Sequence, residues 1–163
     1  MGYTTEFSGR FSLDRALEAN HAAYLRQFAG TRRMRRSESA VATLPDPCRL
    51  AVGLSPGPEG GYFVGGGGVA GQEKDASILE YNKPPQGQPG LWCQWVPTEH
   101  DDGIEWDGGE KFYHYAEWLQ YIIDSFLAPW GYVVEGVVRW EGEEPGDVGH
   151  LTVTANRVAA TAE

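Results

Sequence analysis

Four arginines stand within five residues, at Arg32, Arg33, Arg35 and Arg36, directly after a segment with helical spacing. A guanidinium presents a planar set of donors that matches phosphate and carboxylate groups. Positive side chains at the C-terminal end of a helix also offset its dipole, by about 0.3–1 kcal/mol each at the surface. The cluster therefore predicts either a clamp for an anionic ligand or a set of charges that stabilises a helix end.

The run "PGLWCQWVP" at residues 89–97 holds two tryptophans, Trp92 and Trp95. On a strand over 91–96, alternation places them on opposite faces. One is then expected in the core, and the other is a candidate to stack on a flat ring, which contributes roughly 1–3 kcal/mol per base. The preceding Tyr81-Asn82-Lys83 supplies a ring, an amide and a cation. The predicted ligand-binding residues are Arg32, Arg33, Arg35, Arg36, Tyr81, Asn82, Lys83, Trp92, Trp95 and Trp106.

Patterns that would indicate catalysis are weak. The acidic segment 99–110 includes Glu105 and Asp107 on one strand face, where a metal or a carboxylate pair is conceivable, but turns and helix capping account for most of its acids. His150-x-Thr152 resembles half of a two-histidine phosphoesterase motif, and the second half is absent. The sequence therefore predicts no catalytic residue, no metal site and no cofactor, and it leaves enzymatic activity uncertain.

Glycines and cysteines add little chemistry. Gly66-x-Gly68-x-x-Gly71 matches a dinucleotide fingerprint by letter, but no amphipathic helix follows it, so a flexible loop is favoured. Cys48 and Cys93 lack the spacing of a metal site and are expected as reduced thiols.

The elements that must position these residues alternate between strand and helix. Hydrophobic periodicity predicts strands at 3–13, 62–64, 91–96, 103–106, 132–141 and 150–156, and helices from between Asp14 and Ala19 to Gly30 and over 109–127. Residues 37–90 are expected to be irregular, and 157–163 to fray. The order indicates an α+β fold, a single domain over 1–163, with about two helices on one face of a mostly antiparallel sheet. We expect strands 3–13 and 132–141 to lie close together.

Charge is distributed unevenly along the 163 residues, whose net charge is −10. Residues 1–49 hold 8 Arg and 5 acids, and residues 50–163 hold 5 Lys or Arg and 18 acids. This balance argues against nonspecific nucleic-acid binding. The N-terminus lacks the plan of a signal peptide, and no apolar run has the length of a membrane helix, so a cytoplasmic protein without membrane contact is expected.

The segments "GLWCQWVP", "IEWDGGEKFYHYAEWLQYII", "APWGY" and "GVVRWEGEEPGD" resemble a family of small proteins of bacterial genomes, phages and prophages. The resemblance extends over most of the chain, including "GTRRMRR", and carries no catalytic residue with it. It implies an intracellular accessory protein in phage–host conflict, of a kind that inhibits a host protein or sequesters a signalling nucleotide.

Two hypotheses of function follow, with a third behind them. The first is a non-catalytic protein that sequesters a small anionic ligand, such as a nucleotide signal in host–phage defence. The second is an acidic inhibitor or adaptor that docks on a basic host protein, such as a nucleic-acid-binding or defence protein. The third is a hydrolytic enzyme. A homo-oligomer with sites across a two-fold axis is compatible with each of them.

Overall fold

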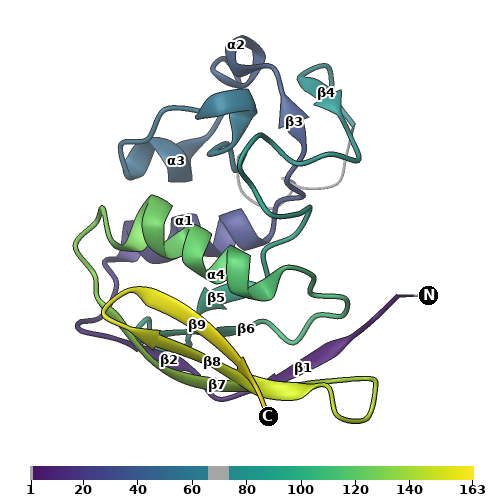
Figure 1. Ribbon diagram of the computed structural model, residues 1–163. Coiled ribbons are helices and arrows are strands. Elements are labelled where there is room, and N and C mark those ends of the chain that lie inside the picture. The colour runs from purple at the N-terminus through teal and green to yellow at the C-terminus, as the bar shows by residue number, and fades with distance from the viewer. Residues whose placement is uncertain (1, 66–73) are drawn as a thin grey trace. The chain divides into compact units, whose positions relative to one another are not determined.

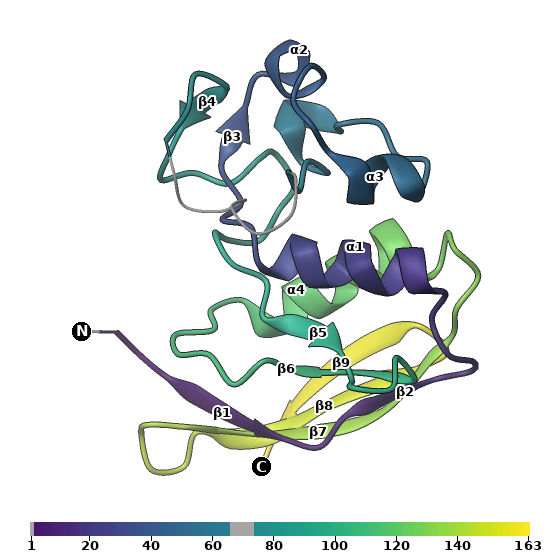
Figure 2. The ribbon, with the colours of Figure 1, turned by 180° about the vertical axis from the view of Figure 1, so that it is seen from behind.

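The computed structural model describes residues 2–65 and 74–163, and the chain divides into two compact units (Figures 1 and 2). The first, here called the sheet unit, comprises Met1–Leu17 and Gln94–Glu163. The second, the coil unit, comprises Glu18–Cys93 and is inserted in sequence between two strands of the first. The sequence predicted a single domain over residues 1–163. The division into two compact units does not test whether they fold as one domain, so this stays a prediction.

The sheet unit contains a seven-stranded sheet in which every pair is antiparallel. Its order is β5-β6-β2-β7-β8-β9, and β1 pairs with β7 beside this path. The strands are β1 Thr5–Ser8, β2 Phe11–Leu13, β5 Trp95–Pro97, β6 Gly103–Trp106, β7 Val134–Gly142, β8 Val148–Thr154 and β9 Arg157–Ala162. The α+β class with a mostly antiparallel sheet is therefore confirmed.

Strand β7 organises the sheet, because β8 pairs along one edge of it while β1 and β2 share the other. The predicted strand 3–13 is thus two strands, and its expected proximity to 132–141 is confirmed. The chain breaks at Gly9, whose φ of 103° favours glycine. At Gly136, whose φ is 142°, a Cβ atom would lie 3.2 Å from Cα of Phe11, so a larger residue would be strained and would push β2 slightly away from β7.

Helix α4, Tyr115–Ile122, continues into one π-helical turn, η2, Ile123–Leu127. The helix predicted over 109–127 therefore begins six residues late. The expected capping at Asp107 is wrong, because Asp107 instead accepts the N–H of Gly109 at 2.7 Å. Positive φ values at Lys111 and His114 keep the intervening residues out of a helix.

Aromatic side chains fill the space between α4 and the sheet. The Phe7 ring makes edge contacts with Trp95, Phe112 and Tyr115 at centroid distances of 5.3, 5.8 and 5.0 Å. The indole N–H of Trp95 donates to the Tyr115 carbonyl at 2.8 Å and ties β5 to the first turn of α4. Phe11 joins the same cluster through Trp95.

The coil unit has short elements joined by irregular backbone, as expected for residues 37–90. Its longest helix is α1, Ala19–Ala29. The others are α2 Glu38–Val41, α3 Pro47–Ala51 and the 3-10 turn η1 Pro58–Gly60. A two-stranded ladder pairs β3, Arg35–Arg36, with β4, Ile78–Glu80. Neither strand was predicted from periodicity, because each is too short to show an alternation.

Three sequence predictions fail locally. Residues 62–64 form no strand, and the strand predicted at 91–96 is limited to β5. Residues 157–162, which were expected to fray, form the outer strand β9 instead. In the described part of the chain, no helix has the length and apolar character needed to cross a membrane.

Replacing Trp95 with alanine should destabilise the sheet unit by about 3–5 kcal/mol, because a buried aromatic ring and its hydrogen bond are lost together. Urea denaturation measures the loss. Val137→Ala, at a position of the same unit that is 52% exposed, is the control and should cost under about 0.5 kcal/mol. Similar losses in the two variants would contradict the central place of Trp95.

Candidate functional site

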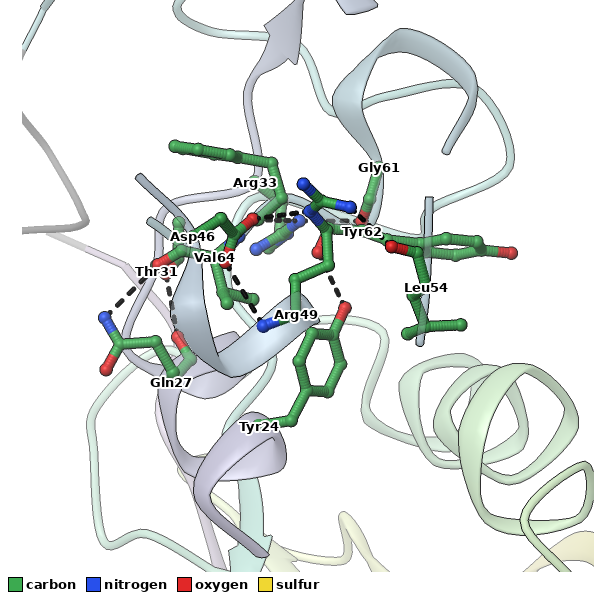
Figure 3. A network of polar contacts seen from close by, with 11 residues as sticks. Tyr24, Gln27, Thr31, Arg33, Asp46, Arg49, Leu54, Gly61, Tyr62 and Val64 are labelled. Carbon is green, nitrogen blue, oxygen red and sulfur yellow. Dashed lines mark hydrogen bonds and ion pairs between the residues drawn. The ribbon is translucent and has the colours of Figure 1, made fainter. Parts of the chain in front are cut away.

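Four successive backbone carbonyls, those of residues 61–64, are hydrogen-bonded by side chains instead of by a neighbouring strand (Figure 3). Tyr24 Oη donates to the Tyr62 carbonyl at 2.7 Å. Gln27 Nε2 and Thr31 Oγ1 each donate to the Val64 carbonyl at 3.2 Å. These side chains replace a strand partner, which explains why the apolar run 62–64 is not a β-strand.

Arg33 donates to the other two carbonyls from a buried position, with 2% of the residue exposed, and Gln88 Nε2 also donates to the Gly61 carbonyl at 2.6 Å. Its Nη2 atom donates to the Gly61 carbonyl at 2.7 Å and to the Phe63 carbonyl at 3.0 Å. Nε donates to Gln88 Oε1 at 3.3 Å, and the guanidinium lies 4.1 Å from the centre of the Phe28 ring. Arg33 therefore holds together segments that are distant in the chain.

A buried ion pair completes this network. Asp46 caps α3 by accepting the Arg49 backbone N–H at 3.3 Å, and its Oδ2 atom accepts from Arg49 Nε at 2.8 Å. The same Oδ2 accepts the Val64 N–H at 3.3 Å, and Arg49 also donates to the Leu54 carbonyl. Sequence analysis missed this pair, although Asp46-Pro47 is a typical helix start that could have indicated it.

Arg35 and Arg36 are engaged in ion pairs. Arg35 Nη2 donates to Glu59 Oε1 at 2.8 Å and lowers the pKa of Glu59 below its ordinary value. Arg36, which is buried, donates from Nη1 to Asp75 at 3.0 Å and to Ser77 Oγ at 2.7 Å. Partial burial raises the pKa of Asp75, but the hydrogen bonds from Ser77 and Arg36 outweigh it and leave that pKa below its ordinary value.

These contacts correct the predicted four-arginine clamp. Arg33 and Arg36 are buried and donate to protein groups, and Arg35 is paired with Glu59 and Glu80, at 2.8 and 3.6 Å. The alternative, that the arginines offset the dipole of the preceding helix, is also incomplete. The side chains of Arg33, Arg35 and Arg36 instead form hydrogen bonds with residues 59–88, which follow in the chain. Of the four, Arg32 retains a half-exposed side chain without a carboxylate partner among the described residues.

Arg32 lies in what we call the Tyr81 cation cluster, which is formed by Arg32, Lys74, Tyr81, Asn82 and Lys83. Arg32 Nε donates to the Tyr81 carbonyl at 3.2 Å, and its Nη2 donates to Asn82 Oδ1 at 3.1 Å. Arg32 Cζ and Lys74 Nζ lie 4.3 and 5.0 Å from the centre of the Tyr81 ring. Lys83 follows Asn82 with an exposed side chain. The structure thus brings together Arg32, Tyr81 and Asn82 of the predicted set, and adds Lys74.

The three predicted tryptophans lie in different environments. Trp95 is 1% exposed and belongs to the aromatic core of the sheet unit. Trp106, in the same unit, donates its indole N–H to Gln94 Oε1 at 3.1 Å. Trp92, in the coil unit, is half-buried. A buried core position for one tryptophan of the pair is confirmed, and a stacking role stays a prediction for Trp92 and Trp106, which are half-buried.

The other candidate motifs remain without a defined site. Among the described residues, no three His, Cys, Asp or Glu side chains gather as a metal ion would require, including those of the acidic segment 99–110. Residues 66, 68 and 71 of the glycine motif lie outside the described residues. Within the sheet unit, Thr4, Glu6, Glu141, Gly142 and Glu143 line a hollow of about 330 Å³.

Comparison with known proteins does not extend this account, since no family model, curated protein or solved structure matches the chain. The resemblance to phage and prophage proteins therefore stays a prediction, and the function must be argued from the residues themselves.

Replacing Arg33 with methionine should destabilise the coil unit by about 3–5 kcal/mol, because the carbonyls of residues 61 and 63 lose a charged donor in a buried place. Urea denaturation should report this loss, together with faster hydrogen exchange at residues 61–65. Arg32→Met, on the same segment but half-exposed, should cost at most about 1 kcal/mol. Equal losses would show that Arg33 has no special structural role.

Proposed function

We propose that this chain is a non-catalytic binding protein that holds a small anionic ligand at the Tyr81 cation cluster. The observation that carries the proposal is a pair of cationic side chains beside one ring, those of Arg32 and Lys74, which have no carboxylate partner among the described residues. The exposed Lys83 lies two residues after Tyr81 in the chain. The net charge of the protein is −10, so cations left unpaired contrast with its overall charge.

The donors of Arg32 are only partly used. A guanidinium has five N–H groups, and contacts with Tyr81 and Asn82 use one on Nε and one on Nη2, which leaves three. The distances to the ring centre bound the separation of Arg32 Cζ and Lys74 Nζ at their sum, 9.3 Å. A ligand that carries one or more phosphate or carboxylate groups and lies beside the ring would therefore be close to both charges.

The ligand class follows from what the cluster offers. Cations already occupy the Tyr81 ring, so the anionic part of a ligand is favoured over a stacked base. Phosphorylated small molecules fit best, and a nucleotide signal in host–phage defence is the member that the family resemblance suggests. We place this activity in the cytoplasm. Among the described residues no group of His, Cys, Asp or Glu side chains could hold a metal ion, and a hydrolytic role is not proposed.

Isothermal titration at low ionic strength with pyrophosphate, nucleoside mono- and triphosphates and citrate tests this proposal. At least one of these anions should bind, and Arg32→Ala with Lys74→Ala should weaken its binding at least about tenfold, because two charged contacts are lost. Arg139→Ala with Lys111→Ala removes the same two positive charges from the sheet unit and should leave binding within about twofold. Failure of every anion to bind at millimolar concentration, or equal losses in the control, would contradict the site.

A second function is favoured by the separation of charge between the units. The sheet unit has 16 acids against 5 Lys or Arg, whereas the coil unit has 7 acids against 8. Within the sheet, Glu6 lies directly opposite Glu141, and both line the hollow with Glu143. Arg139 pairs with Glu141 at 3.3 Å and Glu143 accepts the Thr4 N–H at 2.6 Å, which offsets part of the repulsion. Like charges directly opposite each other are destabilising, so a basic partner protein that neutralises the rest would be bound favourably.

Affinity capture from a bacterial lysate at low and at high salt tests this alternative. A basic partner should be retained at low salt, lost at high salt, and lost when Glu6, Glu141 and Glu143 are changed together to glutamine. Changing Glu99, Glu110 and Glu117 to glutamine removes the same charge from other segments of the sheet unit and should preserve capture. If the partner is captured equally at low and high salt, and also by the variant with Glu6, Glu141 and Glu143 changed to glutamine, an acidic docking surface is ruled out.

A further inference from the structure

Strand β9 lies at the outer edge of the seven-stranded sheet and pairs with β8 alone among the described strands. Its side chains are small and largely exposed, and the strand contains neither proline nor a charge between Arg157 and Glu163. Proteins usually protect such edges with charged residues, proline or bulges, because a free edge pairs readily with another strand. The edge is therefore a place where a further strand can add.

The direction of each backbone group along β9 follows from one hydrogen bond. Glu163 donates its N–H to the Val148 carbonyl at 2.9 Å, so odd-numbered residues face β8 and even-numbered residues face away from it. The Val158 N–H confirms this direction, since it donates to Gln120 Oε1 of α4 at 2.9 Å. Alternation then places the N–H and carbonyl groups of Ala160 on the open edge.

Gln120 covers one end of this edge. Besides accepting from Val158, its Nε2 atom donates to the Asn156 carbonyl at 3.1 Å. The side chain thus satisfies the first outward groups as a neighbouring strand would, while no contact of this kind reaches Ala160 or Ala162 among the described residues.

We propose that β9 pairs antiparallel with β9 of a second copy of this chain, about a two-fold axis at Ala160. Outward groups of even-numbered residues then meet, with Ala160 opposite Ala160 and Val158 opposite Ala162 of the second copy. The same register places Arg157 opposite Glu163 of the second copy, on one face of the joined sheets. Within one copy Glu163 already pairs with Arg139 at 3.2 Å, so Arg157 of the second copy adds a second cation beside this carboxylate. Registers shifted by two residues separate these opposite charges, so charge complementarity selects the alignment on Ala160.

Pairing in this register joins two seven-stranded sheets into one, and Gln120 must release Val158 for the outermost hydrogen bonds to form. The partner is a copy of this chain because β9 is complementary to itself in both backbone direction and charge. This interface uses only the sheet unit, so it is independent of ligand binding at the Tyr81 cation cluster.

Sedimentation velocity over a concentration series up to about 1 mM tests the proposal. The unmodified chain should form a dimer as its concentration rises, and Arg157→Glu or Glu163→Arg alone should weaken the dimer at least about tenfold, since two symmetry-related pairs become repulsive. The double variant Arg157→Glu with Glu163→Arg should restore dimerisation to within about threefold. Lys111→Glu makes the same charge change elsewhere in the unit and should leave the dimer unchanged.

Ala160→Pro provides a test that does not depend on charge. Proline removes an outward N–H that β8 does not use, so the fold should persist by circular dichroism while dimerisation weakens at least about tenfold. A chain that stays monomeric throughout the concentration series would overturn the proposal. So would single charge reversals without effect, a double variant that does not recover, or a dimer that tolerates Ala160→Pro.

Discussion

Buried backbone carbonyls in a segment without strand partners are the constraint on which the coil unit depends. Residues 61–64 cross its interior, and each of their four carbonyls accepts a hydrogen bond from a side chain. Arg33 serves two of them because a guanidinium can direct several N–H groups from one buried position. Its own charge is also favoured by the face of the Phe28 ring, so the cation is solvated by the protein in place of water.

The sheet unit solves the same problem by regular pairing. Strand β7 offers hydrogen bonds along both edges, and the glycines at 9 and 136 allow its neighbours to turn and approach. Aromatic rings then fill the space under α4, where Trp95 links the sheet to the helix. In this unit the backbone N–H and carbonyl groups pair between neighbouring strands. Its charged side chains are therefore not needed for these groups and lie mainly on the surface, where acids outnumber basic residues.

This difference in construction decides which charges can act on a ligand. In the coil unit most arginines are committed to carbonyls or carboxylates of the protein, so a dense arginine run supplies few free cations. Arg32 keeps donors to spare because it lies at the surface beside Tyr81. Most acids of the sheet unit accept a hydrogen bond or pair with a cation, but Glu6 lies directly opposite Glu141, and the proposed basic partner would relieve the repulsion between these two carboxylates.

The sequence by itself determined the α+β class, the antiparallel sheet and the approximate place of its main strands, because alternation over several residues reports which face is buried. It also predicted that one tryptophan of "PGLWCQWVP" lies in the core. Only the tertiary structure decided which one, and it decided that the arginine run is mostly internal. A guanidinium has the same donors whether it meets a phosphate or a carbonyl. The carbonyls at 61–64, about 30 residues away in the chain, leave no mark on the local pattern.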